Sequence, residues 1–198
     1  MIAYISGNIR FKNPAFVVID CGGIGYKTNV SLNTYSKIEN EETAFLFISE
    51  VPRIENQSYA GMELYGFHDE PERELFENLI SVSGVGASTA RIMLSAYKPE
   101  EIKTAISHEN ETLIQSIKGI GPKTAKRIIL ELKDKVSKHA ISANISSGKY
   151  NNNKEEALSA LLALGFARNA AEKALDQAAN DTNINGVEGL IKKALKLL

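Results

Sequence analysis

A short pattern centred on Gly-x-Gly occurs twice in this 198-residue chain, and it is the feature that most constrains the fold. The glycine pairs Gly84/Gly86 and Gly119/Gly121 are 35 residues apart. Matching positions around them hold Val82, Val85, Thr89 and Arg91 in the first copy, and Ile117, Ile120, Thr124 and Lys126 in the second. We therefore predict a tandem pair of helix-hairpin-helix units, in which one helix ends at the glycines and another begins after them.

Each glycine pair meets two physical needs of such a turn. A residue without a Cβ adopts positive φ at no steric cost and lets a ligand approach the main chain closely. We predict that the four glycines serve these needs, and that the aliphatic residue between each pair, Val85 or Ile120, plugs the angle between the helices. The helix that follows presents unpaired backbone N–H groups, which attract an anion such as a phosphate.

A phosphate contact of this kind reads the sugar-phosphate backbone and carries no base information. We therefore predict nucleic-acid binding that is directed by shape and insensitive to sequence, with added phosphate contacts from the hydroxyls of Thr89 and Thr124. The predicted DNA-binding residues are Gly84, Val85, Gly86, Ser88, Thr89 and Arg91 in the first hairpin, and Lys118, Gly119, Ile120, Gly121, Lys123, Thr124, Lys126 and Arg127 in the second.

The structural alternative is that the Gly-x-Gly turns bind nothing. A single copy is more often only a helix C-cap and a tight turn between helices. The repeat favours binding, because packing alone does not require both copies to keep the turn, the threonine and the following cation. Four cations surround the second turn, whereas Arg91 alone follows the first. We expect the second hairpin to dominate the electrostatic attraction.

Composition places any nucleic-acid surface on one local face. The formal net charge is −1 and the pI is near 6.3, so the chain as a whole is not a polycation. Between Lys118 and Lys135, however, six cations stand against two anions, a local balance of +4. A solvated helix with ion pairs at i,i+4 spacing explains Lys133 and Lys135 equally well.

Several classes of protein receive no support from the sequence. No apolar run approaches the ~20 residues of a membrane span, the N-terminus does not resemble a signal peptide, and Cys21 is the single cysteine. We expect a cytoplasmic protein with no membrane partner. The three histidines are scattered without metal-ligand spacing, and no Gly-Lys-Ser/Thr run forms a P-loop. We therefore predict no catalytic residues, no metal and no cofactor.

Residues 1–66 are predicted to form a small closed β-barrel of the OB type. Short stretches rich in β-branched and aromatic residues are punctuated by glycines, which is typical of strands. The expected strands are Ile2–Gly7, Phe16–Asp20, Tyr26–Val30, Ala44–Ile48 and Met62–Phe67. Five aromatic residues in alternating strand positions are interpreted as core: Tyr4, Phe16, Tyr26, Phe45 and Phe47.

The rest of the chain changes to helical periodicity, so the predicted class is α+β and multidomain. Residues 67–141 are assigned to an all-α tandem helix-hairpin-helix domain, with helix starts at Asp69–Glu72 and Lys98–Glu101. Residues 142–153 are polar and lack periodicity, which is typical of a flexible linker.

Residues 154–198 are predicted to form a three-helix module. The turn Leu164-Gly165-Phe166 between its first two helices resembles that of ubiquitin-associated (UBA) modules. A small tethered bundle of this kind usually binds a protein, and its predicted partner-binding residues are Leu161, Leu164, Gly165 and Phe166.

Together these features resemble the RuvA family of bacterial Holliday junction branch migration proteins over the whole chain. The resemblance rests on the opening Met1–Gly7, the Gly22–Tyr26 segment, the Leu64–Phe67 strand, the tandem hairpins and the Leu-Gly-Phe turn. It implies a homotetramer whose concave basic face holds a four-way DNA junction open and nearly planar, for recombination and repair. A tetramer alone or two tetramers enclosing the junction as an octamer both remain open.

The resemblance also implies partners. The C-terminal module would dock the hexameric ATPase RuvB, which pumps the duplex arms and uses the ATP, so this chain needs no cofactor. The resolvase RuvC is a further candidate partner.

Members of the family carry an acidic pin, on the loop before the Leu-Tyr-Gly-Phe strand, which repels phosphates at the crossover. Here the corresponding segment, Glu50–Glu63, lacks the usual adjacent acids and is longer. Glu55 best fits the pin, with Asn56 in place of a second acid. Ser88 also departs from the family pattern, since a lysine often stands there.

Other functions remain as alternatives. The chain could be a general helix-hairpin-helix DNA-binding protein. A base-excision glycosylase of this class would flip a base and attack it, although the N-terminal barrel and the short length oppose that interpretation. A single-strand binder would stack bases on barrel aromatics, which the core assignment of those aromatics opposes.

Overall fold

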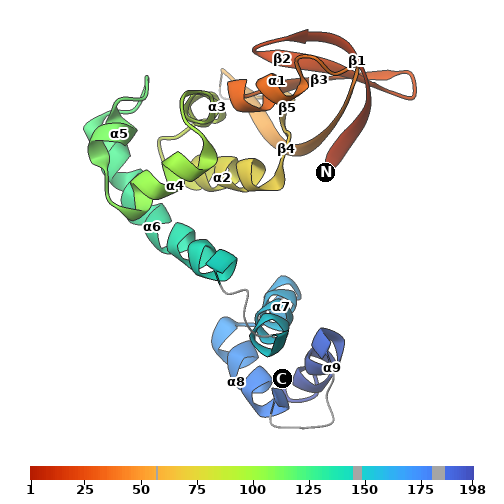
Figure 1. Cartoon of the computed structure of the whole chain (residues 1–198), viewed down its shortest axis with the longest axis vertical. Helices are drawn as coiled ribbons and strands as arrows, with labels where there is room; N and C mark the ends of the chain where they lie inside the picture. The colour runs from red at the N-terminus through yellow and green to blue at the C-terminus, as the bar shows by residue number, and fades with distance from the viewer. Residues whose placement is uncertain (57, 145–148, 180–185) are drawn as a thin grey trace. The chain divides into compact units, whose positions relative to one another are not determined.

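The computed structural model describes residues 1–56, 58–144, 149–179 and 186–198 (Figure 1). The chain divides into two compact units, Met1–Ala140 and Ile141–Leu198. The first unit holds a β-barrel followed by helices, and the second holds helices only. The predicted α+β class is confirmed.

Five strands close into a barrel in the first unit. They are β1 (Tyr4–Asn13), β2 (Phe16–Cys21), β3 (Ile24–Val30), β4 (Thr43–Glu55) and β5 (Ser58–Phe67), in the order β1-β2-β3-β5-β4. All neighbours are antiparallel except β3 and β5. Alternate residues point inward, as the pleat requires, and form a core from Ile5, Val17, Ile19, Val30, Leu46 and Ile48. The barrel predicted from strand patterns is confirmed.

The sequence did not indicate the short helix α1 (Leu32–Ile38), which connects β3 to β4. The Ser31 hydroxyl caps it by accepting the N–H of Thr34 at 3.0 Å. Seven residues are too few to display helical periodicity clearly, because they span only two turns. This helix matters because its polar residues join the barrel to the helical domain.

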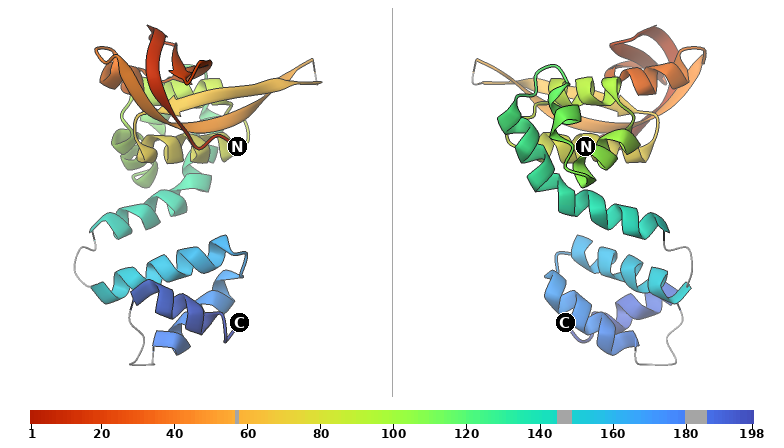
Figure 2. Two further views of the ribbon diagram at one scale, coloured as in Figure 1. Left: turned by 90° about the vertical axis from the view of Figure 1, so that its right-hand side faces the viewer. Right: turned by 60° about the vertical axis from the view of Figure 1, so that its left-hand side comes forward.

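The segment Glu50–Glu63, predicted to be a loop, is instead the outer part of a β-hairpin. Strand β4 continues to Glu55 and β5 begins at Ser58. Figure 2 shows the two strands extending away from the barrel as a narrow ribbon. The loop prediction was wrong. Glycine, proline and charged residues are uncommon in strands, but here each strand is held by its hydrogen bonds to the other.

The core assignment of the barrel aromatics was also wrong in part. Tyr4 is 58% exposed and Phe45 is exposed as well, and their rings stack on the outer surface with centroids 5.0 Å apart. Phe16, Tyr26 and Phe47 are half-buried. Cross-strand aromatic pairs stabilise a sheet from its outer face as well as from its core, so alternation alone did not give the correct face.

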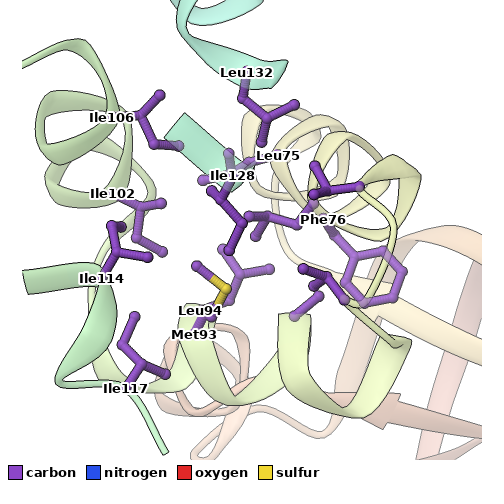
Figure 3. Close-up of a cluster of buried hydrophobic side chains, with 14 of the residues drawn as sticks. Leu75, Phe76, Met93, Leu94, Ile102, Ile106, Ile114, Ile117, Ile128 and Leu132 are labelled. Atoms are coloured by element: carbon purple, nitrogen blue, oxygen red, sulfur yellow. The ribbon is translucent and has the colours of Figure 1, made fainter. Parts of the chain in front are cut away.

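Five helices follow the barrel, of which the last runs past Ala140, the end of the first unit. They are α2 (Glu70–Ser81), α3 (Ala87–Ala96), α4 (Pro99–Ser107), α5 (Glu111–Gln115) and α6 (Pro122–Asn144). Asp69 caps α2 and α4 begins at Pro99, as predicted. Figure 3 shows side chains from these helices pointing into one cluster, which includes Leu75, Met93, Ile102, Ile114 and Ile128. One core therefore holds both hairpins.

Polar contacts fasten α1 to this helical domain. The Asn33 side-chain amide donates to the carbonyl oxygens of Leu94 and Tyr97 at the end of α3. The carboxylate of Glu72, on α2, is buried and accepts hydrogen bonds from the hydroxyls of Ser31 at 2.5 Å and Thr34 at 2.8 Å. Burial raises the pKa of Glu72, and the two hydroxyl donors oppose that rise.

Helices occupy most of the stretch predicted to be a flexible linker. Helix α6 continues to Asn144 and α7 (Lys149–Ala163) begins five residues later, so only 145–148 of the 142–153 linker lie outside the described residues. The asparagines and serines of this stretch have a low helix propensity, but it is not low enough to prevent a helix.

The second unit packs α7 against α8 (Arg168–Ala179) and α9 (Gly186–Ala194). Its small core contains Ala157, Leu161, Ala171, Leu175 and Leu190. Gly165 has φ +92° and ends the turn after α7, where the left-handed conformation favours glycine.

Replacing Thr34 by valine should lower the free energy of unfolding by about 1–3 kcal/mol at pH 7, because Glu72 loses a donor and the His68 N–H loses its acceptor. For a carboxyl whose folded pKa is raised, stability falls as pH rises through its titration. The fall in stability with pH should be steeper in the variant, because the Thr34 hydroxyl stabilises the ionised form of Glu72 and valine does not. Urea unfolding at pH 5 and pH 8, with exposed Thr43→Val as control, measures this; equal losses at both pH values would contradict it.

Candidate nucleic-acid interface

The two predicted hairpins have the same backbone geometry. Gly84 and Gly119 each have φ +93°. In the first turn the Val85 N–H donates to the Val82 carbonyl at 3.0 Å, and in the second the Ile120 N–H donates to the Ile117 carbonyl at 3.1 Å. The sequence repeat is therefore a structural repeat, in which the first glycine of each pair supplies a conformation that other residues rarely adopt.

The second glycine of each pair differs from the prediction. Gly86 has φ −86°, and Gly121 is not among the residues with positive φ. Their carbonyls accept the first helical bonds, from Ala90 and Ala125, at 2.9 Å each. A Cβ at either position would meet nothing within 4 Å. These glycines therefore matter only for the bare surface that they leave at the helix starts.

Apolar residues plug both turns, as predicted. Val85 and Ile120 are buried in the same core as the helices that flank them. The polar residues beside them remain accessible: Ser88 and Lys123 are exposed, and Thr89 and Thr124 are half-buried. Helix α3 has no side-chain cap at Gly86, so its first N–H groups are not satisfied by a side chain.

One pocket joins the two hairpins. It has a volume of about 270 Å³ and is lined by Ser83 and Gly84 from the first turn and by Lys123, Thr124 and Arg127 from α6. The Arg127 guanidinium donates to the Ser83 carbonyl at 3.2 Å. A Cβ on Gly84 would lie 4.0 Å from the Thr124 hydroxyl. The pocket thus gathers two cations and a hydroxyl beside bare main chain.

Ser83 is a residue of the candidate site that the sequence did not indicate. Its contribution is a backbone carbonyl, which any residue type provides, so no sequence signal marks it. Only the fold brings residue 83 next to residue 127.

The cations around the second turn differ in their engagement. Lys118, Lys123 and Lys126 are exposed, and Arg127 also lies 3.8 Å from Glu131 on the next helical turn. Lys133 forms an ion pair with Glu109, and that hydrogen bond raises the pKa of Lys133 and lowers the pKa of Glu109. Lys133 is therefore engaged by an acid distant in sequence and not by the i,i+4 pair of the solvated-helix alternative, whereas the residues at the start of α6 form the positive surface.

Arg91 has a main-chain partner that its place in the repeat did not indicate. Its guanidinium donates to the Ala15 carbonyl at 2.8 Å, and the residue is half-buried. It therefore braces α3 against the turn between β1 and β2. Because the Arg91 side chain makes this contact, the first hairpin offers the site mainly backbone groups and hydroxyls, and little charge.

Glu55, the candidate pin, is exposed at the end of β4. Its carboxylate forms an ion pair with Arg53 at 3.0 Å. The pair partly neutralises the charge that a repulsive pin would need.

The candidate partner-binding residues divide by burial. Leu161 is fully buried in the core of the second unit, Phe166 is half-buried, and Leu164 is 62% exposed. Leu161 therefore supports the module, and Leu164 is an apolar residue on its surface, as are Leu195, Leu197 and Leu198. Within the described residues, no helix is long and apolar enough to span a membrane, and no group of three or more potential metal ligands occurs.

A five-stranded barrel followed by paired Gly-x-Gly hairpins on one core defines a tandem helix-hairpin-helix protein. Comparison with family models agrees, since residues 76–134 match the SAM-like helix-hairpin-helix tandem. Residues 1–66 match the RuvA N terminal domain, and residues 152–198 match the RuvA C-terminal domain. The chain belongs to the RuvA family.

Curated relatives extend over the whole chain. Proteins named Holliday junction branch migration complex subunit RuvA from Christiangramia forsetii and Flavobacterium psychrophilum are each 46% identical over 198 residues, covering all of both chains. One of the same name from Bacteroides fragilis is 45% identical over 206 residues, again at full coverage.

The two glycines of the second turn should respond differently to alanine. Gly119→Ala should lower the free energy of unfolding by about 1 kcal/mol or more, because alanine is strained at φ +93°. Gly121→Ala should change it by less than about 0.5 kcal/mol, because its φ is ordinary and its surroundings are open. Urea unfolding of both variants is the test, and equal losses would show that the turn does not have this geometry in solution.

Proposed function

We propose that this protein binds four-way DNA junctions through their sugar-phosphate backbone, holds them open, and recruits the RuvB ATPase for branch migration in recombination and repair. The pocket that joins the two hairpins carries this proposal. The names of the full-length relatives support it, since each is called a subunit of a Holliday junction branch migration complex.

The pocket chemistry suits a phosphate. Lys123 and Arg127 supply positive charge, Thr124 supplies a hydroxyl, and the bare main chain at Gly84 allows close approach. Charge-assisted hydrogen bonds to an oxyanion are stronger than neutral ones. Because these groups engage phosphates and not base edges, binding is directed by backbone shape and carries no sequence preference.

A four-way junction presents four equivalent duplex arms, which one copy of a two-hairpin domain cannot hold at once. A homotetramer with one copy for each arm matches this symmetry. Simultaneous engagement of several arms also raises the affinity for a junction above that for a linear duplex. Two tetramers enclosing the junction would form an octamer by the same symmetry.

The proposed role is non-catalytic and cytoplasmic. The sequence has no P-loop, so ATP is used by the motor and this chain takes no cofactor. The C-terminal module docks RuvB, with exposed Leu164 and half-buried Phe166 among its apolar contacts. RuvC is a second candidate partner, which would act on the same opened junction.

Replacing Lys123 and Lys126 by alanine should flatten the dependence of junction affinity on salt concentration. Removing one phosphate contact should reduce the slope of log K against log salt by about one unit. Gel shifts at several salt concentrations measure that slope. Lys135→Ala is the matched control, because this exposed lysine lies on the same helix away from the pocket.

An unchanged slope in the Lys123 and Lys126 variants would remove these residues from the interface. If Lys135→Ala reduces the salt slope equally, the effect comes from overall charge and not from the pocket.

A further inference from the structure

Helix α3 begins in the first hairpin and is held to the barrel by hydrogen bonds along its length. Its N-terminal end, after Gly86, forms part of the candidate interface. Its C-terminal end, near Ala96, lies beside α1, the short helix that connects β3 to β4 (Figure 1). Helix α2 follows β5 in the chain, but α3 has no direct chain connection to the barrel. Contacts through space therefore set the position of α3.

Asn33 of α1 binds the C-terminal end of α3. Its side-chain amide donates to the Leu94 carbonyl at 2.5 Å and to the Tyr97 carbonyl at 3.0 Å. Carbonyls at the end of a helix lack partners within the helix, and an amide nitrogen carries two N–H donors. The side chain of Asn33 therefore supplies donors that α3 cannot provide for itself.

Two further hydrogen bonds reach α3 from the barrel. The Ser95 hydroxyl accepts the N–H of Leu32, the first residue of α1, at 3.1 Å. The Arg91 guanidinium donates to the Ala15 carbonyl, in the turn between β1 and β2, at 2.8 Å. We call Asn33, Ser95 and Arg91 the α3 brace. It holds the middle and the C-terminal end of the helix, and the N-terminal end is left to the interface.

The α3 brace fixes what apolar packing leaves adjustable. Met93 and Leu94 of α3 are buried in the core that α2 to α6 share. Apolar contacts have no preferred direction, and packed helices can slide past one another by small amounts. Hydrogen bonds are directional and weaken steeply away from their preferred geometry. The brace therefore selects one angle between α3 and the barrel from those that the core would permit.

The second hairpin takes its position from the first. Among the described residues, the hydrogen bonds that α6 side chains make outside their own helix go to the Ser83 carbonyl, from Arg127, and to Glu109, from Lys133. Both partners belong to the helical domain and neither to the barrel. A change in the angle of α3 would therefore move both hairpins relative to the barrel.

We propose that Asn33 is a positioning residue for junction binding: through the α3 brace it sets the angle between hairpins and barrel at which several copies hold the arms of one junction together. The proposal rests on the junction binding and the homotetramer proposed above, with the copies joined through their barrels. The barrel offers exposed apolar surface for such a contact, since Tyr4 and Phe45 stack on its outside.

The α3 brace should act on junctions and not on single duplexes. Engagement of several arms at once adds affinity only where the geometry of the linked sites permits it. A duplex needs the hairpins of one copy, whose mutual arrangement comes from their shared core. Loosening α3 from the barrel therefore lowers the gain from simultaneous engagement and leaves the local phosphate contacts intact.

Asn33→Asp tests this role, because it keeps the size of the side chain and places a carboxylate against the two carbonyls that the amide binds. In the full-length protein, junction affinity should fall about tenfold, and affinity for a linear duplex should change by less than about twofold. Gel shifts with both DNAs at one salt concentration measure this. A variant that is only less stable loses affinity for both DNAs alike, so the ratio of the two affinities separates positioning from stability.

Asn13→Asp is the matched control. Asn13, like Asn33, is half-buried, but its side-chain oxygen accepts the N–H groups of Ala15 and Phe16 at 2.8 and 2.9 Å. Aspartate keeps that acceptor, so the control adds the same charge to the barrel without losing a contact. Both affinities should stay within about twofold of wild type.

Ser95→Ala is a milder variant, because it removes one hydrogen bond between α1 and α3 and leaves Asn33 in place. It should lower junction affinity about threefold and leave duplex affinity unchanged. It decides the question if Asn33→Asp does not fold. Light scattering should give the wild-type mass for both variants.

The failures are distinguishable. Equal losses of affinity for junction and duplex would overturn the positioning role, as would an unchanged junction affinity in a folded variant. A variant that no longer assembles would also overturn it, since α1 would then serve assembly and not the angle of α3. In each case the proposed function stands. A wild-type protein with no preference for the junction over the duplex would refute the proposed function, and the positioning role with it.

Discussion

The packing of α2 to α6 around one apolar core is the constraint on which the candidate interface depends. Val85 and Ile120 are buried in that core, so each turn is held by the same packing that holds its helices. The Arg127 contact to the Ser83 carbonyl then connects one turn to the other. Because interiors are close-packed and deform little, the two turns keep a fixed relation and form one pocket. A phosphate site built from two separate loops would lack this preorganisation.

Much of this arrangement follows from local sequence. The repeat predicted two equivalent turns, and Gly84 and Gly119 have identical φ angles. Alternation and glycine punctuation predicted the barrel, and Asp69 and Pro99 marked the helix starts. These features depend on backbone conformation within a few residues, which side-chain identity controls directly.

The features that escaped prediction depend on partners distant in sequence. Arg91 matches Lys126 by position in the repeat, yet its guanidinium contacts the Ala15 carbonyl in the barrel. Glu50–Glu63 forms strands because each half pairs with the other, and Tyr4 stacks on Phe45 across strands. Glu72 is buried because Ser31 and Thr34 provide donors from another element. These contacts join residues that are distant in sequence, so the composition of a short segment does not reveal them. The sequence therefore predicted the turns but not the residues that surround them.

Competition between DNA structures tests the central claim, that paired hairpins make this chain a junction-binding protein, most directly. A labelled four-way junction bound by the full chain at moderate salt would be challenged with unlabelled junction, linear duplex and single strand of equal length. If several arms are held at once, duplex and single strand should be needed at about a hundredfold excess over unlabelled junction to compete equally. Equal competition by all three would contradict the account and leave a general helix-hairpin-helix DNA-binding protein.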